Sequence, residues 1–162
     1  MSTAHAGIFS TLRPFGLPPT PILSLIFTYS LNVIATPRQY YGPLLGKNND
    51  DPANLLAGAE RDGEKGLIPK DKLVMITRAR GAAANLNENM PMFVVASLVG
   101  WLAGVTPEYQ NLYHAIWFFS RVAYKWAYLN GEGNLRSLFY ATGFFSTVTM
   151  LIHGGNLLAL KY

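Results

Sequence analysis

Residues 78–93 read RARGAAANLNENMPMF, and this stretch decides how the rest of the chain is interpreted. At the helical spacing of three and four residues, Arg78, Gly81, Asn85, Glu88 and Met92 fall on one face. An apolar run follows directly and continues to Gly104. A charged side chain at membrane depth costs at least about 2.5 kcal/mol on insertion scales. We therefore expect Asn85 and Glu88 to need partners inside a helix bundle or in a neighbouring subunit.

Four apolar segments organise the chain, at about residues 17–36, 72–104, 107–129 and 135–160. Each has about the 20 residues that a helix needs to cross a bilayer, and each is too long for a strand. The sequence therefore predicts one all-α domain over residues 1–162, an integral membrane four-helix bundle. The polar, Gly/Pro-rich stretch at about residues 46–72 is predicted to be a solvent-exposed loop, with one short helix at about residues 52–62.

The composition favours lipid over water as the surroundings of this bundle. Half of the residues are hydrophobic and 14% are charged, against about 25% charged residues in soluble domains. The alternative is a soluble four-helix bundle, but its third and fourth segments would expose rows of Phe, Trp and Leu to water. We see no unbroken basic face for nucleic acid, because acidic residues are mixed with basic ones in the long loop.

Several kinds of chemistry are excluded by the residues that are missing. The chain has no cysteine, so disulfides, protein thiolates and Cys-based metal sites are ruled out. Any thiol chemistry must therefore use the thiol of a small molecule. No His/Asp/Glu cluster has the spacing of metal ligands, so we predict no metal site.

The distribution of lysine and arginine predicts the orientation of the helices. The second connection has no such residue, whereas the first and third connections contain seven: Arg38, Lys47, Arg61, Lys65, Lys70, Lys72 and Lys125. Because basic loops stay in the cytoplasm, we expect the first and third connections on the cytoplasmic side and both termini on the far side.

Polar side chains also mark the third and fourth segments. One stripe along the third segment, at steps of 3, 4, 3 and 4, contains His114, Trp117, Arg121, Tyr124 and Tyr128; the fourth segment opens with Arg136, Ser137 and Tyr140. Arginine binds carboxylates and buried hydroxyls orient a ligand, so this end of the bundle suits an anionic, hydrogen-bonding ligand.

Simpler interpretations remain for three of these residues. Glu88 could form a purely structural ion pair with an arginine. Tyr128 could belong to an interfacial aromatic belt, and His114 is better explained as a packing or interfacial histidine than as a catalyst.

The order Arg78, Asn85, Glu88-Asn89, Pro91 and Phe93 resembles the second-helix signature of the MAPEG family, the membrane-associated proteins in eicosanoid and glutathione metabolism. The stretches RVAYKWAYL (121–129) and LRSLFY (135–140) resemble the third and fourth helices of that family. The resemblance covers roughly residues 20–155.

The resemblance implies a homotrimer of four-helix subunits in the endoplasmic reticulum or a related membrane. It also implies that glutathione binds between subunits near the cytoplasmic side, and that a lipophilic substrate enters from the membrane lipid. Asn85 and Glu88 would hold glutathione from one subunit, together with Arg78 of the second-helix signature. The neighbouring subunit would add Tyr124, Tyr128, Arg136 and Tyr140, with Arg38 at the end of the first helix. Arg136 or Ser137 would stabilise the thiolate, which is the reactive form of a thiol.

Two positions depart from the family pattern. Gly81 stands where many members have a second arginine, and Ala84 stands where some have a basic residue. Each charge-assisted bond that is missing would contribute about 1.5–3 kcal/mol, so glutathione could bind tens of times more weakly.

Three functional hypotheses follow. The first is a membrane enzyme, a transferase, peroxidase or isomerase, that uses the glutathione thiolate on a lipophilic electrophile or hydroperoxide. The second is a non-catalytic or repurposed relative that binds a lipid or a partner, or processes a metabolite without glutathione. The third is a small scaffold subunit of a larger membrane complex.

Overall fold

The computed structural model of the protein describes residues 20–33, 36 and 55–161, and these residues form helices and short turns. The helices are α1 (Thr20–Ser30), α3 (Leu55–Glu64), α4 (Lys70–Ala103), α5 (Pro107–Asn130) and α6 (Gly133–Ala159). No strand occurs within these described ranges. The prediction of an all-α fold is confirmed there, whereas the trimeric membrane bundle stays a prediction.

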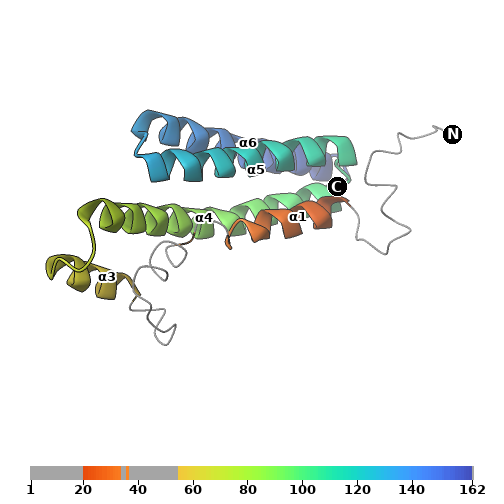
Figure 1. Cartoon of the computed structure of the whole chain (residues 1–162). Helices are drawn as coiled ribbons and strands as arrows, with labels where there is room; N and C mark the ends of the chain where they lie inside the picture. Colours follow the sequence, from red (N-terminus) through yellow and green to blue (C-terminus); the bar gives the residue numbers. More distant parts are fainter. Residues whose placement is uncertain (1–19, 34–35, 37–54, 162) are drawn as a thin grey trace.

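The long helices lie side by side in alternating directions (Figure 1). α5 and α6 form an antiparallel hairpin that packs on α4, and α1 runs along α4 and α5. The short α3 packs mainly against the start of α4. As a result, α3, the start of α4 and the α5–α6 turn all lie at one end of the molecule.

Glycine ends two of the long helices in the same way. Gly104 after α4 and Gly131 after α5 both adopt left-handed backbone, with φ of 84° and 79°. In each case the next residue donates its N–H to a carbonyl five residues back, Val105 to Gly100 and Glu132 to Ala127. Because glycine has no Cβ, it adopts this conformation without strain. The two sharp stops allow the short connections that keep α4, α5 and α6 adjacent.

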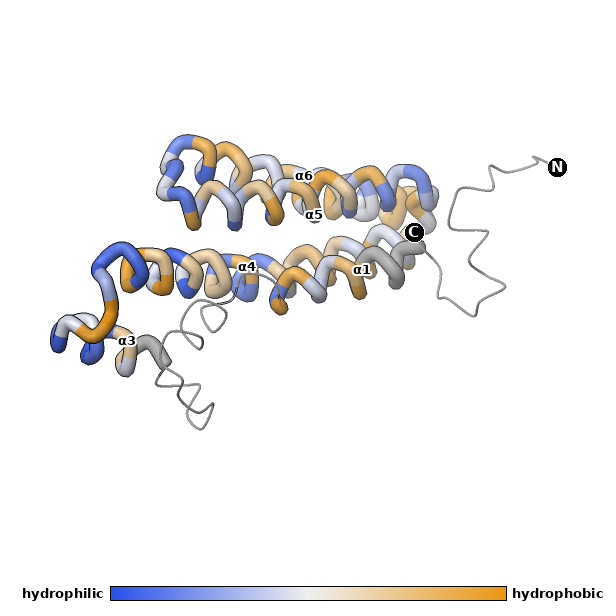
Figure 2. The backbone as a smooth tube through the Cα atoms, viewed as in Figure 1, coloured by the Kyte–Doolittle hydropathy of each residue, from blue (hydrophilic) through white to orange (hydrophobic). Residues whose placement is uncertain are grey.

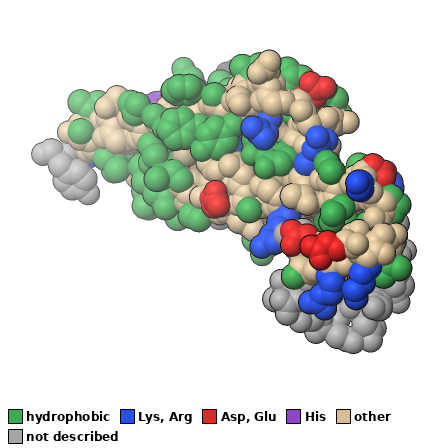
Figure 3. All heavy atoms as spheres, turned by 90° about the vertical axis from the view of Figure 1, so that its left-hand side faces the viewer, with side chains coloured by type: hydrophobic (Ala, Val, Ile, Leu, Met, Phe, Trp, Pro, Cys, Tyr) green, Lys and Arg blue, Asp and Glu red, His purple; other side chains and the backbone are tan. Residues whose placement is uncertain are grey.

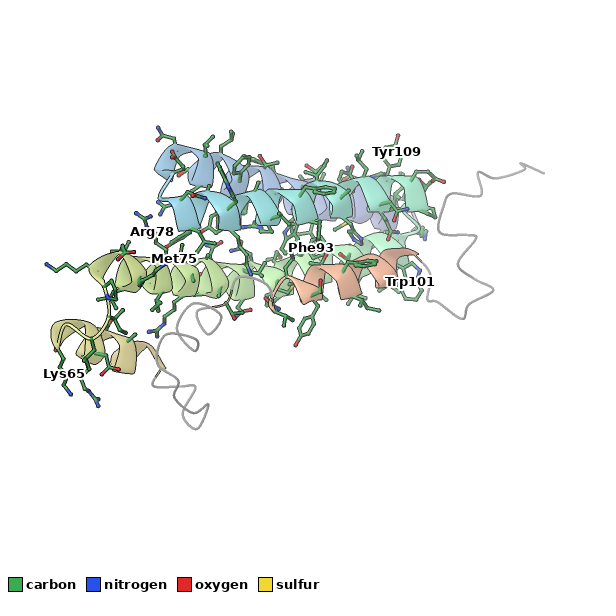
Figure 4. All side chains as sticks on the ribbon, viewed as in Figure 1. Lys65, Met75, Arg78, Phe93, Trp101 and Tyr109 are labelled. Atoms are coloured by element: carbon green, nitrogen blue, oxygen red, sulfur yellow. The ribbon has the colours of Figure 1, made fainter. Side chains whose placement is uncertain are left out.

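The core lies at the middle of the helices and packs two aromatic rings among aliphatic side chains. Phe93 of α4 stacks on Trp117 of α5 with ring centroids 4.2 Å apart, and His114 meets the same Phe93 edge-on at 5.1 Å. Figure 4 shows Phe93 between α4 and the neighbouring helices. His114 is buried in these contacts, which agrees with the packing role predicted for it.

α4 and α6 approach closely beyond the core. A Cβ atom on Gly154 would meet Val99 Cγ1 at 3.0 Å and the Gly100 backbone at 3.3 Å. Small residues allow helix backbones to come this near, which is the usual device for helix contacts in membranes. Gly100 therefore serves the contact, while Gly104 serves as the cap.

The surface favours a lipid environment for α6. Among the described helices, α6 alone is long and apolar enough to cross a membrane, and 22% of its most apolar stretch is buried inside the molecule. Length and composition would also admit the core helix of a soluble protein, but such a helix is mostly buried. Large side chains such as Leu102 and Phe119 are about two-thirds exposed. Hydrophilic residues gather instead at α3, the start of α4 and the α5–α6 turn (Figure 2).

Charged side chains are concentrated in the same region. Figure 3 views the end of the molecule that lies on the left in Figure 1, and there basic and acidic side chains gather on one part of the face. Hydrophobic side chains cover much of the rest. The described part of the predicted first connection, α3 and the start of α4, therefore lies at the same end of the molecule as the third connection.

Candidate functional site

A cavity of about 340 Å³ lies where α5 ends and α6 begins. It is lined by three tyrosines, one arginine and one serine: Tyr124, Tyr128, Arg136, Ser137 and Tyr140. All five were predicted as site residues from the sequence. They come together because α5 and α6 are joined by a single tight turn, so the last two turns of one helix face the first two turns of the other.

Arg136 supplies the positive charge of this cavity. It lies in the first turn of α6 and is exposed, and its guanidinium carbon lies 5.1 Å from the centre of the Tyr128 ring. A guanidinium over a ring face is attracted to the ring and still keeps its N–H groups available to an anion. Arg136 is thus held in place and ready to bind an anion.

Ser137 is less available as a donor. Its hydroxyl donates a hydrogen bond of 3.1 Å to the Gly133 carbonyl, one turn back along α6. To stabilise an anion, this hydroxyl would first have to break that bond. Of the two residues predicted to stabilise a thiolate, Arg136 therefore has the more suitable geometry.

Tyr128 links the cavity to α4 at Gly81. A Cβ atom at Gly81 would overlap the Tyr128 hydroxyl and lie 2.8 Å from Cζ of the same ring. The ring of Tyr128 also meets that of Tyr124, with centroids 5.6 Å apart. The space that a side chain at position 81 would need is thus filled by Tyr128, which gives the glycine at this position a physical reason.

Arg78 lies beside this cavity rather than in it. Its Nη1 donates a 3.1 Å hydrogen bond to the Leu129 carbonyl near the end of α5, and its guanidinium packs against Gly131. Figure 4 shows Arg78 in the space between α4 and the α5–α6 hairpin. Arg78 lines a second cavity of about 160 Å³, which shares Tyr128 and Arg136 with the first cavity. A cation at the carbonyl end of a helix is favourable, so Arg78 also stabilises the end of α5.

The other predicted α4 residues line neither cavity. Asn85 is half-buried and its Oδ1 accepts a long hydrogen bond of 3.4 Å from Arg121 Nη1. Glu88, three residues further on, is exposed, and no ion-pair partner for it occurs among the described residues. The structural ion pair considered for Glu88 is therefore absent from the described part of this subunit.

Arg121 was predicted as part of the polar stripe of the third segment but was given no role toward glutathione. It lies at the centre of the contacts between Asn85, Tyr124 and Tyr140. The signal was present in the sequence, because Arg121 belongs to the polar stripe of the third segment. Spacing alone could not show that its charge lies inward, beneath the tyrosines that line the cavity.

Lys125 corrects the assignment of basic residues to loops. It was counted with the third connection, but it lies inside α5 and is 5% exposed. Its ammonium donates a hydrogen bond to the Leu31 carbonyl just after α1. A lysine near a helix end looks like a loop residue in sequence, and only packing shows that a backbone carbonyl holds it. Without Lys125 the third connection, residues 130–134, contains no lysine or arginine, and the predicted orientation then depends on the first connection.

Arg38, the remaining residue of the predicted site, lies outside the described residues.

Comparison with known proteins assigns the family. The model of the MAPEG family matches residues 19–156. The chain belongs to the MAPEG family. As a MAPEG protein it is membrane-associated, helical and related to glutathione metabolism in general terms. Neither a search of curated proteins nor a search of solved structures returned a match.

Proposed function

We propose that this MAPEG protein is a membrane enzyme that uses the thiolate of glutathione on a lipophilic electrophile or hydroperoxide. The cavity of about 340 Å³ carries this proposal, because its lining combines one exposed arginine with three tyrosines and no acidic residue. Such a lining attracts an anion and orients it by hydrogen bonds. A thiolate is such an anion, and it is the nucleophilic form of a thiol.

In this proposal the site is completed between two subunits of a homotrimer. Asn85 and the exposed Glu88 of one subunit hold the peptide backbone and amino group of glutathione. The cavity residues Tyr124, Tyr128 and Tyr140 come from the neighbour, with Arg38 nearby. The exposure of Glu88 in the single subunit supports this arrangement, since a carboxylate at that depth of a membrane helix needs a partner.

Arg136 and the sulfur of glutathione carry the proposed chemistry. Arg136 stabilises the negative charge of the sulfur before and during attack, because preorganised donors act strongly where charge gathers. In a conjugation, sulfur forms a bond to carbon and a leaving group departs with the electron pair. In a peroxidase reaction, the thiolate sulfur attacks the outer oxygen of the hydroperoxide, the O–O bond breaks, and the alkoxide takes a proton from water and leaves as an alcohol. A second glutathione then reduces the sulfenic acid to give glutathione disulfide and water. The lipophilic substrate reaches this end of the helices from the lipid, in the endoplasmic reticulum or a related membrane, with the α3 end in the cytoplasm.

The test is glutathione titration and turnover by the protein purified in detergent. We expect saturable glutathione binding by calorimetry and glutathione-dependent turnover of a general electrophile or a lipid hydroperoxide. Arg136→Ala should lower turnover by about 100-fold, in line with the loss of one donor from an anion site. Arg80→Ala is the matched control, because Arg80 is exposed on α4 and lines neither cavity.

A second candidate is a repurposed relative that acts without glutathione. The observation that favours it is the overlap at Gly81, since Tyr128 occupies the space that a basic side chain would need there. The two candidates differ in thermal unfolding with glutathione. A ligand present at 100 times its dissociation constant adds about 2.7 kcal/mol of stability. No thermal shift, together with no turnover, would favour the repurposed relative and contradict the enzyme.

A further inference from the structure

Arg121 is a buried cation with little to compensate it. It is 1% exposed, and its only hydrogen bond within the described residues is the 3.4 Å contact from Nη1 to Asn85. Its Nε and Nη2 atoms are buried and have no partner there. Burying a charge costs much free energy unless the charge is paired and hydrogen-bonded. The burial of Arg121 therefore lowers the stability of this fold.

Aromatic rings provide the rest of its surroundings. The guanidinium carbon lies 5.2 Å from the ring centre of Trp117, 5.8 Å from that of Tyr124 and 5.2 Å from that of Tyr140. On α6, Gly143 makes room for it, because a Cβ atom there would lie 2.8 Å from Nη2. The contacts leave a net positive charge that no described carboxylate neutralises.

Packing alone does not explain why this residue carries a charge. A buried charge can often be replaced by an apolar side chain of similar volume with no loss of stability. The location of the charge offers a better reason. Tyr124 and Tyr140 line the larger cavity, whereas Arg121 lies behind them and does not line it. The charge is thus close to the cavity but shielded from water.

We propose that Arg121 is a positioning residue, which holds the two tyrosines and Asn85 and places a positive charge behind the cavity wall that favours the anionic form of a bound thiol. This inference rests on the proposed function. Where water is excluded, a charge several ångströms away still acts on the ligand, because screening is weak. Arg136 then meets the anion directly, and Arg121 acts through the tyrosines.

The groups that surround Arg121 on each helix matter for a test by pH. α4 contributes the Asn85 amide, α6 contributes Tyr140, and α5 itself contributes Trp117 and Tyr124. Lys125 is the next cation along α5, and it bonds the Leu31 carbonyl near the end of α1. No carboxylate among the described residues forms an ion pair with Arg121. Replacing Arg121 by an uncharged residue should therefore remove one positive charge from behind the cavity.

The experiment measures the ultraviolet absorption of glutathione thiolate bound to the purified protein, as a function of pH. Arg121→Met keeps an unbranched, flexible side chain, although a shorter one, and removes the charge. We expect it to raise the pH midpoint of thiolate formation by about one unit, which is a tenfold loss of thiolate below the midpoint. Arg121→Lys should keep the wild-type midpoint. The exposed Arg80→Met is the control and should change neither midpoint nor binding.

A second pair of variants compensates the charge and keeps the arginine. The Ser120 hydroxyl, which donates to the Trp117 carbonyl, and Arg121 Nη2 both lie against Gly143, at 2.5 Å and 2.8 Å from its Cβ position. Ser120→Asp would place a carboxylate near Arg121 and offset its positive charge. Ser120→Asn has the same shape and no charge. We expect the pH midpoint of thiolate formation to rise in Ser120→Asp but not in Ser120→Asn. This pair tests the role of the Arg121 charge if Arg121→Met does not fold.

The outcomes separate the two proposals. Wild-type protein that shows neither saturable glutathione binding nor a thiolate signal would contradict the proposed function. A wild-type signal whose midpoint is the same in Arg121→Met, or the same in Ser120→Asp and Ser120→Asn, would overturn the positioning role. A change in thermal stability with an unchanged midpoint would assign Arg121 to packing alone.

Discussion

Gly81 shows how a single missing side chain can shape a site. Without a Cβ atom, α4 leaves room for the Tyr128 hydroxyl, and the Tyr128 ring in turn supports the guanidinium of Arg136. A chain of contacts thus runs from a glycine on one helix to the principal cation on another. The identity of residue 81 therefore affects the cavity although Gly81 does not line it.

Gly81→Ala should displace Tyr128 and destabilise the protein. Overpacking of this kind costs about 1–3 kcal/mol, and the loss of support for Arg136 should weaken glutathione binding several-fold. Thermal unfolding and calorimetry in detergent measure the two effects. In the double variant Gly81→Ala/Tyr128→Phe part of the lost stability should return, because the overlapping hydroxyl is gone. A double variant no more stable than Gly81→Ala would assign the loss to the Tyr128 ring, whose Cζ lies 2.8 Å from the Cβ position, rather than to its hydroxyl.

Arg78 should be tested for stability separately from binding. Its bond to the Leu129 carbonyl is partly buried, so Arg78→Ala should lower the free energy of unfolding by about 1 kcal/mol. Arg78→Lys should lose less, because an ammonium at the end of α5 is still favourable. Arg80→Ala should have almost no effect in the same unfolding measurement. Equal losses in the Ala variants of Arg78 and Arg80 would contradict the role of Arg78 at the helix end.

At the scale of helices, the close approach of α4 and α6 makes a clear prediction. Gly154→Ala would place a methyl group 3.3 Å from the Gly100 backbone and should destabilise the protein by about 1–3 kcal/mol. Gly155→Ala is an ideal control, since nothing lies within 4 Å of its Cβ position. That variant should gain up to about 1 kcal/mol, because alanine favours helix. Chemical unfolding in detergent should rank the two variants on opposite sides of the wild type.

The helices themselves were readable from the sequence, because long apolar segments between glycines and prolines allow few other structures. The α4 signature and the α5 stripe likewise indicated which polar side chains matter. Spacing could not show how far each one turns inward. Arg121 and Lys125 are both buried, whereas Glu88 is exposed. Those differences depend on the rotation of each helix against its neighbours, which packing determines and local sequence does not.

At the scale of the whole molecule, the question is whether two subunits complete one site. Glu88→Ala and Arg136→Ala should each be inactive alone if the site needs both residues. In trimers assembled from an equal mixture of the two variants, about one quarter of the interfaces would pair an intact Glu88 with an intact Arg136. We therefore expect about a quarter of wild-type turnover from co-refolded or co-expressed subunits.

The matched control is wild type mixed with the double variant Glu88→Ala/Arg136→Ala. It contains the same number of altered residues and should also leave about one quarter of the interfaces intact in a random trimer. If each site lies within one subunit, this control would retain about half of the activity and the first mixture none.

The burial of Lys125 also simplifies the determination of membrane sidedness by chemical labelling. Its amine is held inside α5 and bonded to a carbonyl, so it should react slowly with amine reagents. The exposed lysines at positions 65, 70 and 72 flank the start of α4, whereas Lys161 lies beside Gly104 at the opposite end of that helix. In sealed vesicles, an impermeant reagent should therefore modify one of these two groups and spare the other. Peptide mapping would then read the orientation directly, without interference from the interior of the bundle.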